Sequence, residues 1–160
     1  MIRAVRISLA LAWIGLLAGC AATPRIHDVE VSRGTAIATV AERLVGTPYR
    51  FGADGEGGFD CSGLAVYAYE SVGITIPRTA AEQALAARPV PLRDLMPGDL
   101  LFFRIDSRHV DHVGIYVGGG RFVHAPRPGA LVSYASLGDR FFRRHLVSAG
   151  RFWRWRVVAR

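Results

Sequence analysis

Residues 112–125 read HVGIYVGGGRFVHA, two apolar runs that are separated by three glycines. Glycine supplies the left-handed backbone that short hairpin loops need, so this segment predicts two antiparallel strands with a three-residue loop at residues 118–120. An antiparallel hairpin restricts the chain to folds that contain an antiparallel sheet.

The register of this hairpin places two histidines together. A three-residue loop pairs Val117 with Arg121 and, by continuation, Gly114 with His124. His112 then lies diagonal to His124 on the same face, about 7–8 Å away at the backbone, which two imidazoles can span. Gly114 leaves room for the rings. A loop one residue longer or shorter would separate the histidines onto opposite faces.

The rest of the chain predicts helices first and then a run of strands. This order is typical of an α+β fold, here with N-terminal helices packed on an antiparallel sheet of about five to six strands. We see no internal repeat and expect one domain over residues 35–160. The expected helices cover residues 35–45, 61–73, 77–87 and 139–146, and further strands fall within 96–103, 131–134 and 151–158.

The N-terminus has the pattern of an export signal. Arg3 and Arg6 precede an uncharged apolar stretch, residues 7–18, that is too short for a comfortable membrane span of about 20 residues. The stretch ends LAGC and resembles the bacterial lipobox. We therefore expect residues 1–19 to be a lipoprotein signal peptide, and residues 20–34 to form a tether with a lipid on Cys20. The alternative is an ordinary signal or an uncleaved anchor with an incidental cysteine.

The charge and the export signal together restrict the partners. The chain carries a formal charge of +7, and residues 1–19 contribute two arginines and no acid, which leaves +5 after cleavage. Such a charge suits an acidic partner or surface. Export disfavours nucleic acid. By resemblance to bacterial lipoproteins, the absence of Asp after Cys20 implies an outer-membrane lipoprotein that faces the periplasm.

The other cysteine, Cys61, lies in the stretch FDCSG and is expected at the start of a helix that Asp60 caps. A helix N-terminus or a neighbouring imidazolium can lower the pKa of a cysteine from about 8.5 to roughly 3.5–7.5, which yields the nucleophilic thiolate. Asp60 opposes this effect unless capping occupies its carboxylate. Gly63 keeps the turn beside the sulfur uncrowded. The alternative is an ordinary buried cysteine.

One cysteine at a helix start and two histidines on one sheet face fit nucleophilic catalysis. His112 would take the proton of the Cys61 thiol and later protonate the leaving amine, and His124 would orient the His112 ring. Two alternatives stay open. The histidines could be structural, and the three residues could bind zinc, although no CxxC-type spacing supports a metal site.

Six short motifs occur in an order that resembles the NlpC-type papain-like cell-wall peptidases. The resemblance covers about residues 35–160 and implies a papain-like core. The long loop GADGEGG departs from many relatives and affects one wall of the groove. The motifs are GTPYRFG (46–52), FDCSG (59–63), IPRTAAEQ (76–83), PGDLLFF (97–103), DHVGIYVG (111–118) and FVHA (122–125).

The resemblance implies roles for single residues. Cys61 is the nucleophile, His112 the base and His124 the third member of the triad. Tyr49 lends its hydroxyl to the oxyanion hole beside the Cys61 N–H. Three further positions match the family near the substrate groove, although capping and helix-surface roles would also explain them: Asp60, Ser62 and Arg78.

The implied reaction is hydrolysis of peptide bonds in peptidoglycan stems or cross-links through an acyl-enzyme, without a metal or other cofactor and by a monomer. Amidase or acyl-transfer chemistry, and a non-catalytic wall-binding lipoprotein, are the alternatives. A C-terminal set of arginines is expected to meet stem carboxylates or anionic lipid, or to form a solvated basic face. The set is Arg140, Arg143, Arg144, Arg151, Arg154 and Arg156.

Overall fold

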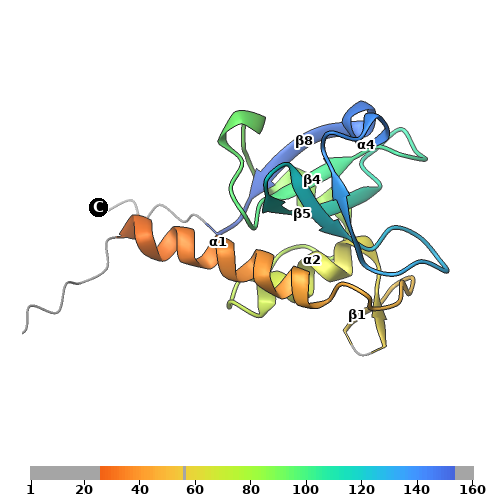
Figure 1. Ribbon diagram of the computed structural model, residues 1–160, viewed down its shortest axis with the longest axis horizontal. Helices are drawn as coiled ribbons and strands as arrows, with labels where there is room; N and C mark the ends of the chain where they lie inside the picture. The colour runs from red at the N-terminus through yellow and green to blue at the C-terminus, as the bar shows by residue number, and fades with distance from the viewer. Residues whose placement is uncertain (1–25, 56, 154–160) are drawn as a thin grey trace, which may run out of the picture.

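The computed structural model describes residues 26–55 and 57–153, and side chains from residue 33 onward (Figure 1). The expected signal peptide, Cys20 and the last residues of the expected final strand lie outside the described residues. No helix in the described part of the chain has the length and apolar character needed to cross a membrane.

A six-stranded antiparallel sheet forms the centre of the domain, in the order β3-β8-β4-β5-β6-β7. This confirms the α+β class and the expected number of strands. The strands are β3 (Arg88–Pro89), β4 (Leu100–Phe103), β5 (His112–Gly118), β6 (Arg121–His124), β7 (Ser133–Ser136) and β8 (Leu146–Arg151).

The helices cover the two faces of this sheet unequally. Figure 1 shows α1 and α2 together on one side of the sheet and α4 on the other. The larger core lies on the α1–α2 side, where Leu64 of α2 packs with Val113 and Ile115. A smaller aromatic core lies on the α4 side, around Phe103 and Phe122. The helices are α1 (Ile26–Arg43), α2 (Cys61–Glu70), α3 (Ala80–Ala86), α4 (Arg140–His145) and the 3-10 turn η1 (Leu92–Asp94).

Helix α1 is longer than expected. It begins at Ile26, so residues 26–34, which we expected in the tether, are helical. No proline interrupts residues 26–43, and each residue added to an existing helix gains one backbone hydrogen bond. Gly34, which we expected at the end of the tether, lies inside the helix. A glycine is needed here because a Cβ would clash with the carbonyl oxygen of Pro97 and the ring of Trp153.

The final strand is displaced from the expected position. Strand β8 ends at Arg151, whereas the alternating pattern predicted a strand over residues 151–158. Arg151 is also not part of a basic surface, because its side chain is buried and bonds the fully buried Asp99. Its Nε and Nη2 donate to the two carboxylate oxygens of Asp99 at 2.6 and 2.7 Å. Burial of the pair explains why the surface interpretation of Arg151 was wrong.

The β5–β6 hairpin reaches the expected register by a different turn. Gly118 pairs with Arg121, so the turn has two residues rather than three. A bulge at Val117 compensates for the missing residue, and Ile115 pairs with Val123 as the expected register requires. Without the bulge, the shorter turn would have moved every following side chain of β6 to the other face.

The glycine in the middle of β5 has a different neighbour from the expected one. A Cβ at Gly114 would clash with the ring of Phe122, so this glycine makes room for Phe122 rather than for the histidine rings. Phe122 in turn packs edge-to-face on His124, with ring centroids 5.3 Å apart. The glycine therefore supports the position of His124 indirectly.

The glycine-rich loop before α2 contains structure of its own. β1 (Asp54–Gly55) pairs with β2 (Gly58–Phe59). Tyr49 forms an isolated bridge with Phe59, and its N–H donates to the carbonyl of Ala130 at 2.9 Å. These bonds hold Tyr49 beside the segment that enters α2 at Cys61.

Candidate active site

Cys61 is the first residue of α2, and Asp60 is its N-cap, as expected. The Asp60 carboxylate accepts a hydrogen bond from the Gly63 N–H at 2.6 Å. The first N–H groups of a helix have no partner within the helix. The N–H of Cys61 is one of these donors.

Gly63 is needed for a close approach of two backbone segments. A Cβ at this position would clash with the carbonyl oxygen of Ala53 and lie 3.0 Å from its carbonyl carbon. The glycine-rich loop therefore packs directly onto the first turn of α2, and the N–H of Asp60 donates to the Ala53 carbonyl at 2.9 Å.

The three expected groove residues form one polar cluster. Arg78 donates to Asp60 through Nη1 at 3.0 Å and Nη2 at 2.7 Å, and to Ser62 at 3.0 Å. Burial alone would raise the pKa of Asp60, but the hydrogen bonds from Arg78 and Gly63 outweigh it and lower the pKa. Arg78 also lies 3.3 Å from the carboxylate of Asp54. Asp60 is thus an ionised carboxylate whose charge is compensated.

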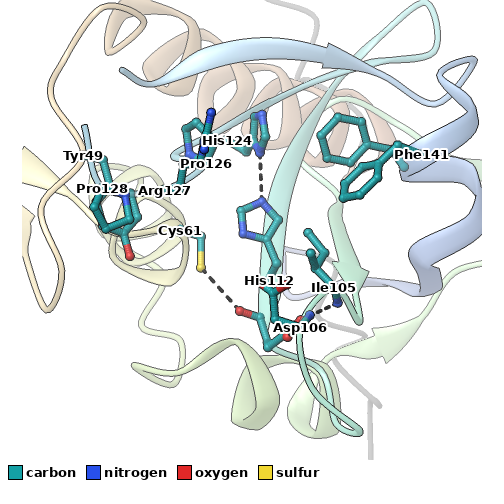
Figure 2. A pocket seen from close by; sticks show the side chains of 12 residues that line it. Tyr49, Cys61, Ile105, Asp106, His112, His124, Pro126, Arg127, Pro128 and Phe141 are labelled. Carbon is teal, nitrogen blue, oxygen red and sulfur yellow. Dashed lines mark hydrogen bonds between the residues drawn. The ribbon is translucent and has the colours of Figure 1, made fainter. Parts of the chain in front are cut away.

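The Cys61 thiol is partly buried against the start of β5. Its sulfur donates to the backbone carbonyl of Asp111 at 4.0 Å (Figure 2). Burial raises the pKa of Cys61 more than the hydrogen bonds from the Val113 and Ser62 N–H groups lower it. A helix start can lower the pKa of a cysteine, but at Cys61 desolvation is the larger effect. In the resting site Cys61 is a neutral thiol.

His112 and His124 lie side by side on the α4 face of the sheet. The distance from His112 Nε2 to His124 Nδ1 is 2.8 Å, and the rings are nearly perpendicular. Both side chains are buried, and the rings of Phe103 and Phe142 contact them. The pairing that the hairpin register predicted is present.

Both imidazoles are neutral in this environment. Burial lowers the pKa of His112 to about 4, although the carboxylates of Asp111 and Asp106 oppose the shift. Burial, with the adjacent His112, lowers the pKa of His124 to about 3. A neutral imidazole has one N–H and one lone pair. If His112 donates from Nε2 to His124, its Nδ1 has the lone pair that can accept a proton.

Cys61, His112 and Tyr49 meet at one cavity of about 540 Å³. Figure 2 shows the Nδ1 side of the His112 ring directed toward the Cys61 sulfur, with Tyr49 on the other side of Cys61. Burial is the largest cause that raises the pKa of Tyr49, and the nearby Asp60 carboxylate raises it further. The phenol keeps its proton and can donate a hydrogen bond.

Cys61 lies between two depressions. The first, called here the histidine-side pocket, is the cavity of Figure 2 and contains His112 and His124. The second, called the Arg78-side pocket, is lined by Asp60, Ser62 and Arg78 and by neither histidine. Tyr49, Cys61 and Asp111 line both. The two pockets form one groove across the thiol, with chemically different ends.

The sequence patterns did not reveal part of the histidine-side pocket. Its walls include Ile105, Asp106, Pro126, Arg127, Pro128 and Phe141. These residues come from three separate segments with no periodic pattern. The only sequence feature that could have indicated this wall is the Pro-Arg-Pro stretch directly after FVHA.

A Cys–His–His set is chemically able to bind zinc. Across the described residues, no three or more His, Cys, Asp or Glu side chains are grouped so that they could hold a metal ion. Cys61, His112 and His124 are placed for proton transfer between a thiol and an imidazole.

Comparison with known proteins places these features in a family. Residues 46–151 match the NlpC/P60 family. The chain is 43% identical to "Murein DD-endopeptidase MepH" of Escherichia coli, over 78% of this chain and 48% of that protein. It is 37% identical to "Gamma-D-glutamyl-L-lysine dipeptidyl-peptidase" of Bacillus subtilis, over 77% of this chain and 43% of that protein.

Solved structures give the same result. An NlpC/P60 family protein from Bacillus cereus superposes with a TM-score of 0.72 and 32% identity, over 76% of this chain and 40% of the other. The chain thus spans about half or less of the length of these relatives.

Proposed function

The chain belongs to the NlpC/P60 family, and we propose that it is a cysteine endopeptidase that hydrolyses peptide bonds in peptidoglycan stems or cross-links. The observation that carries the proposal is the His112–His124 pair facing the thiol at a helix N-terminus, within a groove open on both sides of Cys61. The names of the two curated relatives support the substrate class.

The first chemical step follows from the neutral resting site. As the thiol sulfur attacks the substrate carbonyl carbon, its proton passes to Nδ1 of His112. The His112 Nε2–H donates to His124 and holds the ring in the tautomer that accepts this proton. The carboxylates of Asp111 and Asp106 favour the imidazolium that forms, since both raise the pKa of His112.

The negative oxygen of the tetrahedral intermediate needs donors near the sulfur. The Cys61 N–H at the start of α2 and the Tyr49 hydroxyl are the proposed pair. One such donor is typically worth about 10²–10³ in rate. Collapse of the intermediate breaks the C–N bond, and the His112 imidazolium gives its proton to the leaving amine. Water, deprotonated by His112, then hydrolyses the thioester and restores the thiol.

We also propose that the enzyme is a monomeric lipoprotein of the outer membrane that faces the periplasm. The support is the basic start, the apolar stretch and the LAGC end of residues 1–20. A lipid on Cys20 would hold the domain near the wall, and its positive charge suits an anionic polymer. Palmitate labelling of cells that express the chain should depend on Cys20.

The test uses the full chain, purified in detergent with a reductant, and intact sacculi. Mass analysis of the released fragments should show new amino termini within peptide stems or cross-links. Cys61→Ser should release none, and Cys20→Ser, the matched change at the other cysteine, should cut normally. Fragments that form with Cys61→Ser would refute the proposal. Loss of activity with EDTA that zinc restores would favour the metal alternative, and products joined to a second amine would indicate acyl transfer.

A further inference from the structure

The two ends of the groove must receive different halves of the substrate. Under the proposed function, His112 protonates the leaving amine, and a general acid must be within hydrogen-bond reach of that nitrogen. His112 lines only the histidine-side pocket. The leaving half of the substrate therefore occupies the histidine-side pocket, and the acyl half occupies the Arg78-side pocket.

Arg127 is the cation of the histidine-side pocket. Its side chain is exposed, and no acidic side chain in the described part of the chain forms an ion pair with it. Arg78 at the other end differs, since Asp60 and Asp54 already balance its charge. Of the two groove arginines, Arg127 is the one whose charge is available to a ligand.

The backbone around Arg127 is held in place. Prolines flank it on both sides, which fixes their own φ angles and restricts the residue before each of them. Its carbonyl accepts from the Ala130 N–H at 3.1 Å. The segment follows His124 directly at the end of β6. A guanidinium on such a segment loses little backbone entropy when it binds a ligand.

The other charges of this pocket lie on a different wall. Asp106 and Asp111 belong to the loop before β5, whereas Arg127 follows β6 (Figure 2). The Asp111 carboxylate accepts from the N–H groups of Ile105 and Asp106, at 2.8 and 2.7 Å. The Asp106 carboxylate is exposed and would repel an anion. A negative group is therefore directed toward Arg127 and away from the loop.

We propose that Arg127 binds a free carboxylate on the leaving residue, so that this carboxylate determines which substrates are cut fastest. This inference rests on the proposed function. Guanidinium and carboxylate form paired, charge-assisted hydrogen bonds that a neutral carboxamide cannot match. The preference for the free acid over the amide should be about 10-fold in kcat/KM, because the site is open to solvent.

The test compares two cross-linked muropeptide dimers that differ in one group: the carboxylate on the residue that carries the leaving amine is free or amidated. The full-length wild type should prefer the free acid by about 10-fold. Arg127→Gln should cut both at the rate of the amide, and Arg127→Lys should keep part of the preference. Arg93→Gln, on the exposed 3-10 turn η1 outside both pockets, should keep all of it.

The outcomes separate the two proposals. Three results would overturn the role of Arg127 and leave the peptidase proposal intact. The wild type could cut both dimers equally, Arg127→Gln could keep the wild-type preference, or the cut bond could be one whose leaving residue has no free carboxylate. Failure of the wild type to cut either dimer or sacculi would refute the peptidase proposal, and the subsite would fall with it.

Discussion

His112 Nε2 and His124 Nδ1 lie 2.8 Å apart, and a two-residue turn and a one-residue bulge in β5 bring the two rings to the same face of the sheet. This contact leaves Nδ1 of His112 toward the thiol. A neutral third residue can fix the tautomer of the base, but it stabilises an imidazolium less than a carboxylate does.

The role of His124 as an orienting acceptor can be tested by substitution. His124→Ala should lower kcat by about 100-fold, because the His112 ring loses the partner that selects its tautomer. His124→Asn keeps an acceptor oxygen and should retain more activity. The measurement is muropeptide cleavage, with the Tm of each variant as a check on folding. A wild-type kcat in His124→Ala would show that the His112 ring needs no orienting partner.

Tyr49→Phe removes the proposed oxyanion donor and keeps the ring. We expect kcat to fall by about 100-fold with little change in KM, since the hydrogen bond forms mainly in the transition state. Tyr67→Phe is the matched control, because Tyr67 lies on α2 and is 41% exposed. A wild-type rate for Tyr49→Phe would remove the hydroxyl from the mechanism.

The buried histidines predict a loss of stability in acid. Their pKa values are about 4 and about 3 in the folded protein and about 6.5 when unfolded. Between pH 6.5 and 4 the unfolded chain binds more protons, so stability falls as the pH falls through this window. Each histidine should remove on the order of 2 kcal/mol between pH 7 and pH 5.

The measurement is urea unfolding at both pH values. His112→Gln and His124→Gln should each show a smaller loss than the wild type. The carboxylates of Asp60 and Asp111 have lowered pKa values and titrate below this window. An equal pH dependence in the wild type and both variants would contradict the neutral, buried state of the pair.

The buried Arg151–Asp99 pair should matter for folding rather than catalysis. Arg151→Met leaves the Asp99 carboxylate buried without its partner and should cost about 3–5 kcal/mol in the free energy of unfolding. Arg143→Met, on the surface of α4, should change it by less than about 0.5 kcal/mol. Urea unfolding distinguishes them, and similar values would show that the ion pair adds nothing to stability.

Gly63→Ala is expected to damage the enzyme although alanine is the better helix former by about 1 kcal/mol. The added Cβ would meet the Ala53 backbone and push the glycine-rich loop away from α2. Both Tm and kcat should fall. Gly73→Ala is the comparison variant. Its Cβ would meet no neighbour, so any loss of stability there comes from the positive φ of this residue and not from a clash. An unchanged kcat in Gly63→Ala would show that this contact does not position the site.

Features set by near neighbours in the chain could be predicted from the sequence. The cap at Asp60 and the pairing of His112 with His124 depend on helix and strand periodicity over a few residues. Arg151 was misplaced because its partner Asp99 is 52 residues away, and no local pattern links them. The direction of the pKa shift of Cys61 could not be predicted from the sequence, because burial, the largest cause of the shift, is a property of the packed fold.

The bulge at Val117 has a consequence for how related chains should be aligned and engineered. Inserting or deleting a single residue between the two histidines moves one of them to the other face of the sheet if the turn and the bulge keep their lengths, whereas a residue added to the turn or to a second bulge leaves the faces unchanged. For the two imidazoles to share a face, the number of residues between them and the sum of turn and bulge must both be odd or both be even, as here, where residues 113–123 separate them and the turn and bulge add to three. Loop grafts at this tip should be chosen by that sum.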